Sequence, residues 1–170
     1  MSALIETTRF HLRPLTVADV TERYLLWLHD PEAERYISSS AATHSLSDLR
    51  AYVQARVDRP DVLFLGIFDK KTGAHVGNIK YEPLNSEAGY AVMGILIGDA
   101  AYRGRGTAAE VLDASSAWLK RHRGIGEVIL TVEAGHDRAI RAYTAAGFGV
   151  EESSHHPLAR AGLVSMVRRL

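Results

Sequence analysis

The residues best suited to chemistry in this sequence lie in one short segment, Arg103-Gly104-Arg105-Gly106-Thr107-Ala108. The segment follows an apolar run, Ala91 to Ile97, that is typical of a strand, and it opens a pattern of apolar and small residues at helical spacing. Its glycines let the backbone approach a ligand closely, and the start of a helix offers unbonded N–H groups and partial positive charge. Arginines can add charge-assisted hydrogen bonds. The segment therefore predicts a phosphate- or pyrophosphate-binding loop for a nucleotide or a nucleotide-bearing cofactor.

One interpretation of this loop is a dinucleotide-binding fingerprint. Gly104, Gly106 and Ala109 have its spacing, and the acidic Glu133 follows the next expected strand. That fingerprint, however, begins where its strand ends, whereas six residues separate Ile97 from Gly104 here. It also opens a series of strand–helix–strand units, and this chain supplies about one.

A second interpretation takes Arg103 to Ala108 as Arg-x-x-Gly-x-Ala, which resembles the acetyl-CoA pyrophosphate loop of the GNAT N-acetyltransferase superfamily. Because such short patterns also occur by chance, a glycine-rich turn without a ligand is a third interpretation. The surrounding sequence has to distinguish them.

Composition limits the class of protein. A chain of 170 residues predicts a single domain, residues 1–170, that can build a core without disulfides or metals. Its 20 basic and 20 acidic residues balance, so no overall field attracts nucleic acid or anionic lipid. The absence of cysteine excludes thiolate catalysis and cysteine metal sites. The N-terminus, Met1 to Arg9, has no apolar core of signal-peptide length, and no apolar run approaches a membrane span, so we expect a soluble, cytoplasmic protein.

Hydrophobic periodicity and turn residues predict the elements that position the loop. We expect strands at residues 10–14, 62–68, 75–81, 90–97, 127–132, 148–152 and 163–170. We expect helices from a Thr16 cap to a break at Pro31, at about 47–57, after the loop, and at 137–146. Gly94 is expected at a bulge or a close approach, and Gly147 at a helix C-terminus. This order is that of a mixed α+β domain, mostly antiparallel before the loop.

A second motif decides between the interpretations. The segment His136-x-Arg138-Ala139-Ile140-Arg141-x-Tyr143-x-x-x-Gly147-Phe148 resembles the Asn-x-x-Ala-x-x-x-Tyr-x-x-x-Gly-Phe segment that follows the fifth strand of GNAT proteins. Trp27 to Glu32 and Gly77-Asn78-Ile79 are similar to the branch with ribosomal-protein N-terminal and sugar-nucleotide N-acetyltransferases. The element order fits over essentially the whole chain, so the dinucleotide interpretation is set aside.

The resemblance implies a fold and an activity. The fold is an α+β GNAT-like domain whose mixed, mostly antiparallel sheet is splayed between its fourth and fifth strands (90–97 and 127–132) and flanked by about four helices. The activity is direct transfer of an acetyl group from acetyl-CoA, a co-substrate, to a primary amine, with no metal. The acceptor is a small amine such as an amino sugar or a protein N-terminus, and a homodimer is compatible with the resemblance.

The resemblance also implies site residues. The loop backbone would hold the pyrophosphate, the fourth strand near its end would pair with the pantetheine arm and polarise the thioester carbonyl, and the helix after the fifth strand would add a contact. These cofactor-binding residues are Leu96, Ile97, Arg103, Gly104, Arg105, Gly106, Thr107, Ala108, His136 and Ala139. Tyr143 lies at the usual general-acid position, where a phenol with a pKa of about 10 can protonate the leaving thiolate. Alternatively, Tyr143 is an aromatic anchor beside Ile140 on a buried helix face.

Two departures from the family pattern keep another function open. His136 stands where the family has Asn, and Val92 stands where close relatives often carry a glutamate, a candidate general base. A base would then be another residue or a water. The alternative is a catalytically silent acyl-CoA-binding sensor or scaffold.

The acceptor groove is expected between the first two helices, the serine- and alanine-rich loop from Tyr36 to Ser47, and the 83–88 connection. The loop has no run of acidic residues, and a groove for a basic peptide would be expected to show more carboxylates, so a small polar amine is slightly favoured over a basic peptide. Against this, Glu82, Glu87 and Glu133 could converge and hold an N-terminal ammonium.

Overall fold

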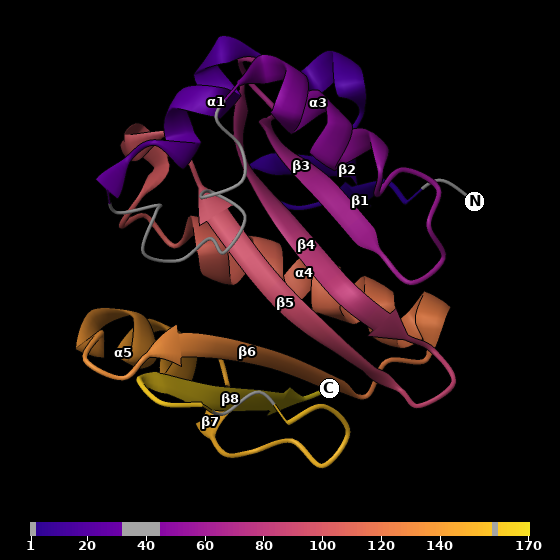
Figure 1. The fold of residues 1–170 in the computed structure, drawn as a ribbon, viewed down its shortest axis with the longest axis vertical. Helices are drawn as coiled ribbons and strands as arrows, with labels where there is room; N and C mark the ends of the chain where they lie inside the picture. The colour runs from indigo at the N-terminus through magenta and orange to yellow at the C-terminus, as the bar shows by residue number, and fades with distance from the viewer. Residues whose placement is uncertain (1–2, 32–44, 158–159) are drawn as a thin grey trace.

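The structure, a computed structural model, describes residues 3–31, 45–157 and 160–170. Eight strands form one sheet in the order β1-β2-β3-β4-β5-β6-β8-β7 (Figure 1). The strands are β1 (Ile5–Glu6), β2 (Phe10–Pro14), β3 (Leu63–Asp69), β4 (His75–Asn85), β5 (Tyr90–Ile97), β6 (Glu127–Glu133), β7 (Gly149–Val150) and β8 (Leu163–Arg169). The described α-helices are α1 (Glu22–Leu28), α3 (Leu46–Gln54), α4 (Thr107–Arg123) and α5 (Asp137–Ala145), and two 3₁₀ turns are η1 (Val17–Asp19) and η3 (Ala100–Tyr102).

The sheet is antiparallel except where β5 meets β6. Because parallel neighbours require a crossover, α4 lies between these two strands in the chain and covers one face of the sheet (Figure 1). The predicted α+β class, with a mixed and mostly antiparallel sheet and about four helices, is confirmed.

Two hydrophobic clusters hold helices to the two faces of the sheet. Val111, Leu112 and Leu119 of α4 join one cluster with the inward side chains of the strands. Trp27 of α1 and Leu49 of α3 belong to the second cluster, on the opposite face. Side chains that alternate along the central strands therefore point either toward α4 or toward α1 and α3.

Most predicted elements are present, with differences at several boundaries; the helix expected at about 47–57 is α3, which ends at Gln54. The helix capped by Thr16 divides, because the Asp19 carboxylate accepts from the Thr16 amide and closes a short η1, after which Thr21 caps α1. The predicted connection at Pro83 is instead strand: β4 continues to Asn85 across a register shift between Tyr81 and Leu84, which accommodates a residue without an N–H.

The strand predicted at 148–152 is reduced to the two residues of β7, and β1 was not predicted. Both are edge strands of two residues, too short for an alternating pattern to reveal. Because β1 precedes all predicted strands, the predicted fourth and fifth strands are β5 and β6. In the described part of the chain, no helix is long and apolar enough to cross a membrane.

Candidate active site

The central feature of the site is the separation of β5 from β6. Their pairing covers only Tyr90, Ala91 and Val92, against Glu127, Val128 and Ile129. Beyond these pairs the strands diverge, and α4 and α5 each begin shortly after a diverging strand ends (Figure 1). The predicted splay between residues 90–97 and 127–132 is confirmed.

Two glycines lie where β5 diverges from β6, Gly94 within the strand and Gly98 just after its end. Gly94 pairs regularly with Lys80, and a Cβ on it would meet no atom within 4 Å, so it leaves open space rather than forming a bulge. A Cβ on Gly98 would collide with the indole of Trp27. Gly98 therefore makes room for α1 to pack against the end of β5.

The register of β5 with β4 decides which backbone N–H and C=O groups of β5 face the gap. The Gly98 amide donates to the carbonyl oxygen of Val76 at 3.0 Å, and along an antiparallel pair every second residue is hydrogen-bonded to the neighbouring strand. Leu96 therefore turns its backbone toward β4, as its close approach to Gly77 also indicates. Met93, Ile95 and Ile97 turn theirs toward the gap that faces β6. Of the two residues predicted to pair with a ligand arm, Ile97 faces this gap with its backbone, and Leu96 reaches the site through its side chain.

The loop before α4 has the shape of an anion-binding site. Gly104 and Gly106 adopt left-handed backbone angles, with φ of 68° and 73°, and a Cβ on either would meet nothing within 4 Å. Gly106 is the N-cap of the 17-residue α4, whose first amides have no partner within the helix. The Thr107 hydroxyl donates to the carbonyl oxygen of Tyr102 at 2.8 Å. The side chain therefore turns toward the protein and does not cover the backbone amides at the start of the helix. Ala108 follows in the first turn.

The two arginines of the loop differ. Arg103 turns back toward β5: its Nε donates to the carbonyl oxygen of Ile97 at 2.8 Å, and its guanidinium also donates to Gly98 and to Asp30, both at 3.1 Å. Arg105 is exposed, and its carbonyl oxygen accepts from Arg9 at 3.0 Å. The Arg103 side chain thus connects the loop to β5 and to the end of α1 by hydrogen bonds, whereas Arg105 lies on the surface.

The start of α5 lies where β6 ends. His136 is the N-cap, and its Nδ1 accepts from the Ala139 amide at 3.0 Å. The ring therefore replaces the side-chain cap that an asparagine would supply. Both predicted contact residues of this helix are engaged in the cap.

Tyr143 lies on the face of α5 that borders the same gap. Its ring contacts Phe148 edge-to-face, with centroids 5.8 Å apart, and burial raises its pKa above the ordinary value of a phenol. Both interpretations of Tyr143 therefore have a physical basis, because its ring packs against Phe148 and the residue also borders the gap.

A cavity of about 400 Å³ opens between the diverging strands. Side chains from β4, β5, β6, α1, α3 and α5 line it. Val92 is among them, so the position at which the family resemblance suggests a glutamate lines the cavity with an apolar side chain. Glu82 and Glu133 line it as well, whereas Glu87 lies in the exposed turn before β5. Two of the three predicted carboxylates are thus brought together.

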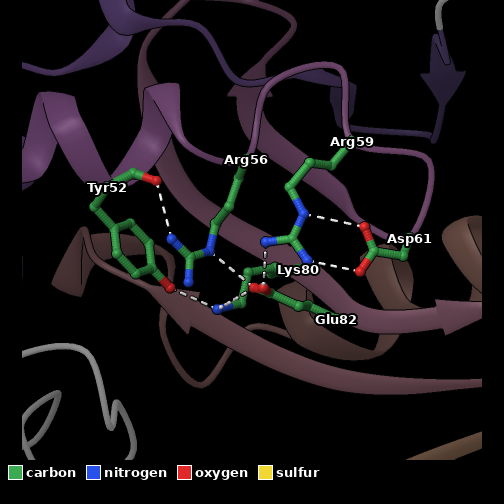
Figure 2. Close-up of polar contacts among 6 residues, drawn as sticks. All are labelled: Tyr52, Arg56, Arg59, Asp61, Lys80 and Glu82. Carbon is green, nitrogen blue, oxygen red and sulfur yellow. Dashed lines mark hydrogen bonds and ion pairs between the residues drawn. The ribbon is translucent and has the colours of Figure 1, made fainter.

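Glu82 belongs to a network of charges on the β4 side of the cavity (Figure 2). Its carboxylate contacts Arg56 at 2.8 Å, Lys80 at 3.2 Å and Arg59 at 3.3 Å. Burial alone would raise the pKa of Glu82, but the hydrogen bond from Arg56 and the nearby ammonium of Lys80 outweigh burial and lower it. A carboxylate with a lowered pKa is a weaker base than an ordinary glutamate.

Two neighbours of Glu82 on β4 also face the cavity, and the sequence did not single them out as site residues. Lys80 donates to the Tyr52 hydroxyl at 2.5 Å, which joins β4 to α3 (Figure 2). Asn78 is only 4% exposed, and its Nδ2 has no hydrogen-bond partner among the described residues. The signal in the sequence is the alternation of polar Asn78, Lys80 and Glu82 with apolar Ile79 and Tyr81.

The acceptor loop predicted from Tyr36 to Ser47 lies outside the described residues, except for its last positions from Ser45. His155 and His156, adjacent in the sequence, both stack on Tyr90. In the described ranges, no group of three or more His, Cys, Asp or Glu side chains could hold a metal ion.

Comparisons with known proteins agree with this geometry. The family model of the acetyltransferase (GNAT) domain matches residues 9–149. No curated protein matches the chain by sequence. Among solved structures, RimL, a ribosomal alpha-N-protein acetyltransferase in complex with coenzyme A, is similar with 16% identity and a TM-score of 0.82, over 99% of this chain and 98% of that chain.

Two further solved structures are similar. A chimera of the spermidine N-acetyltransferase SpeG from Vibrio cholerae and hSSAT has 14% identity and a TM-score of 0.78, over 95% of this chain and 96% of that chain. The microcin self-immunity acetyltransferase MccE, in complex with acetyl-CoA and AMP, has 13% identity and a TM-score of 0.78, over 96% and 93% of the two chains. At these identities the structural likeness establishes the fold, and the family model covers most of the chain. This protein therefore belongs to the GNAT acetyltransferase family.

Proposed function

We propose that this protein transfers an acetyl group from acetyl-CoA to a primary amine. The observation that carries the proposal is the divergence of β5 from β6 beside the glycine loop at the start of α4. Acetyl-CoA supplies an activated thioester, and the similar structures of RimL and MccE contain coenzyme A and acetyl-CoA respectively. The open space at Gly104 and Gly106 fits a pyrophosphate, because the backbone there can approach an anion without a side chain in the way.

Each part of the site has a proposed task. The amides of Gly104 to Ala108 hold the pyrophosphate, and Arg105 adds charge at the surface. The backbone of Met93, Ile95 and Ile97 binds the arm of the cofactor as an added strand would and places the amide of Ile97 or Ile95 to polarise the thioester carbonyl. Arg103 fixes the end of β5 in this geometry.

Tyr143 is the proposed general acid. The acceptor nitrogen forms a bond to the carbonyl carbon, the carbon–sulfur bond breaks, and the phenol of Tyr143 protonates the sulfur that leaves. Because burial raises its pKa, Tyr143 stays protonated through neutral pH. The acceptor must react as a neutral amine, so a proton also leaves its nitrogen, to water or to a cavity side chain. Tyr143 then regains a proton from solvent.

The test is release of thiol from acetyl-CoA in the presence of a panel of primary amines. Acceptor-dependent release supports the proposal. Binding of acetyl-CoA by calorimetry without release for any amine would favour the silent sensor instead, and absence of both binding and release would reject both functions.

A further inference from the structure

The wall of the cavity formed by β4 and α3 presents hydrogen-bond donors from three side chains: Tyr52, Asn78 and Lys80. All three line the cavity. We call them the donor wall. Its composition bears on which acceptor the site takes.

Asn78 supplies the first donor. The ring of His75 lies 2.7 Å from Asn78 Oδ1 through its Nε2, and since a carbonyl oxygen only accepts, the ring nitrogen donates. His75 is packed among the rings of Tyr24, Trp27 and Phe68, which fixes its position. This bond orients the amide of Asn78 and leaves its Nδ2 without a partner in the described structure, on a residue that is only 4% exposed. A buried donor without a partner is unfavourable unless a ligand or water accepts from it.

Lys80 and Tyr52 supply the other donors. Of the three hydrogens of the Lys80 ammonium, one is directed to the Tyr52 hydroxyl and one to Glu82 at 3.2 Å, which leaves a third for a ligand. Tyr52 accepts from Lys80 and so keeps its own O–H to donate. Lys80 stands opposite Gly94, which carries no side chain to fill the space in front of it.

The donor wall also has a surplus of positive charge. The network behind it contains three cations, Arg56, Arg59 and Lys80, and two carboxylates, Asp61 and Glu82 (Figure 2). Arg56 and Arg59 already contact Glu82, so this carboxylate is not available to a second ammonium of a ligand. The opposite wall carries Glu133 and Tyr143 on β6 and α5, together with Arg160.

From this arrangement we propose that the acceptor is an amine that also carries an anionic oxygen group, a carboxylate or a phosphate, and that Asn78, Lys80 and Tyr52 bind that group. The amine then extends toward Tyr143 and Glu133 across the cavity. A polyamine is disfavoured, because Glu82, the carboxylate beside the donor wall, is engaged by Arg56 and Arg59, and the wall itself offers a second ammonium only the neutral oxygens of Asn78 and Tyr52. This inference rests on the proposed acetyl transfer.

The experiment compares five acceptors on the full chain with saturating acetyl-CoA: serine, serine amide, glucosamine 6-phosphate, glucosamine and spermidine. We expect at least one anionic compound to exceed its neutral counterpart about tenfold or more in kcat/KM, as one added charged hydrogen bond would give. A preference for serine over its amide identifies a carboxylate, and a preference for the phosphorylated sugar identifies a phosphate. Equal use of neutral and anionic compounds, or a preference for spermidine, would overturn the inference.

Variants distinguish a specific role of the donor wall in binding the anionic group from a general loss of structure or activity. Lys80→Met keeps the apolar stem and removes the charge, and it should reduce the ratio of kcat/KM for the anionic acceptor to kcat/KM for its neutral counterpart roughly 10- to 100-fold. Asn78→Leu should likewise reduce the preference for the anionic acceptor over its neutral counterpart. Lys71→Met, at an exposed turn lysine, is the matched control and should change nothing. Equal losses for both acceptors in Lys80→Met would mean that Lys80 only supports the fold.

Failure of the proposed function is recognised separately. If no compound releases thiol, binding of the same five compounds is measured by calorimetry on the protein with coenzyme A. Anion-selective binding that Lys80→Met abolishes would support the donor wall without the reaction. Binding that does not discriminate, or no binding of any compound, would reject the donor wall.

Discussion

Arg103 donates a hydrogen bond to Asp30 at 3.1 Å and thereby joins the loop before α4 to the end of α1. The same guanidinium donates to the carbonyl oxygens of Ile97 and Gly98, where β5 ends. One side chain thus holds three segments that meet at the open end of the sheet. This arrangement separates Arg103 from Arg105, which the loop pattern alone makes equivalent.

Arg103→Ala should therefore act on stability. Loss of a charged donor to two carbonyls and a carboxylate, on a side chain that is 26% exposed, should lower the free energy of unfolding by about 1–2 kcal/mol. The exposed Arg105→Ala should change it by less than about 0.5 kcal/mol and should weaken acetyl-CoA binding more at low than at high salt. Urea denaturation and calorimetry at two salt concentrations measure both effects. Equal destabilisation by the two variants would contradict a stabilising role of the Arg103 hydrogen bonds.

Gly106→Glu should abolish acetyl-CoA binding, because a carboxylate and a Cβ would occupy the proposed pyrophosphate position. Gly73→Glu is the matched control: Gly73 has a φ of 72° against 73° for Gly106, equally open surroundings, and a place in the β3–β4 turn. Each variant should lose about 1–2 kcal/mol of stability from the left-handed backbone. Only Gly106→Glu should lose cofactor affinity in calorimetric titrations. A Gly106→Glu protein that still binds acetyl-CoA would place the pyrophosphate elsewhere.

Tyr143→Phe should reduce turnover by roughly 10²- to 10⁴-fold, the usual contribution of a positioned acid, with acetyl-CoA affinity and Tm close to those of the unaltered protein. The ring and its contact with Phe148 remain, so only the hydroxyl is removed. The converse variant, Phe148→Leu, keeps the hydroxyl and disturbs the packing. It should lower Tm and retain most of the turnover. If Tyr143→Phe turns over at the original rate under saturating substrates, the tyrosine is an anchor and another donor protonates the thiolate.

His75 should make stability depend on pH. Burial lowers the pKa of His75 in the folded protein below its ordinary value of 6.5, so between the two values the unfolded chain binds a proton that the native state does not. Stability from the neutral His75 is therefore full above pH 6.5 and declines as the pH falls through the folded pKa. When denaturation is measured from pH 7.5 to 5, the free energy of unfolding should decline less in His75→Gln than in the unaltered protein.

The exposed His122→Gln serves as the control for His75. Parallel declines in all three proteins would contradict a buried neutral imidazole at position 75.

The sequence by itself determined the parts of the site that are local in the chain. Gly104 and Gly106, with an apolar run before them and a helical pattern after them, predicted the loop, since glycine supplies left-handed angles and a helix start supplies amides. The segment from His136 to Phe148 predicted the helix that is α5, with Tyr143 on it, whereas its cap by His136 emerged only in the structure. Gly147, with a φ of 92°, ends that helix as expected. These features depend on neighbours within a few residues, which a sequence displays directly.

Only the tertiary structure decided which distant side chains share the cavity. Lys80 and Tyr52 are 28 positions apart, and Arg103 and Asp30 are 73 apart, so neither contact has a local pattern. The direction of each backbone group on β5 followed from its register with β4, because a shift of one residue would exchange those that face the gap for those that face the neighbouring strand. The donor wall arose in the same way: alternation on β4 gave Asn78 and Lys80 one face, and the packing of α3 decided what that face meets.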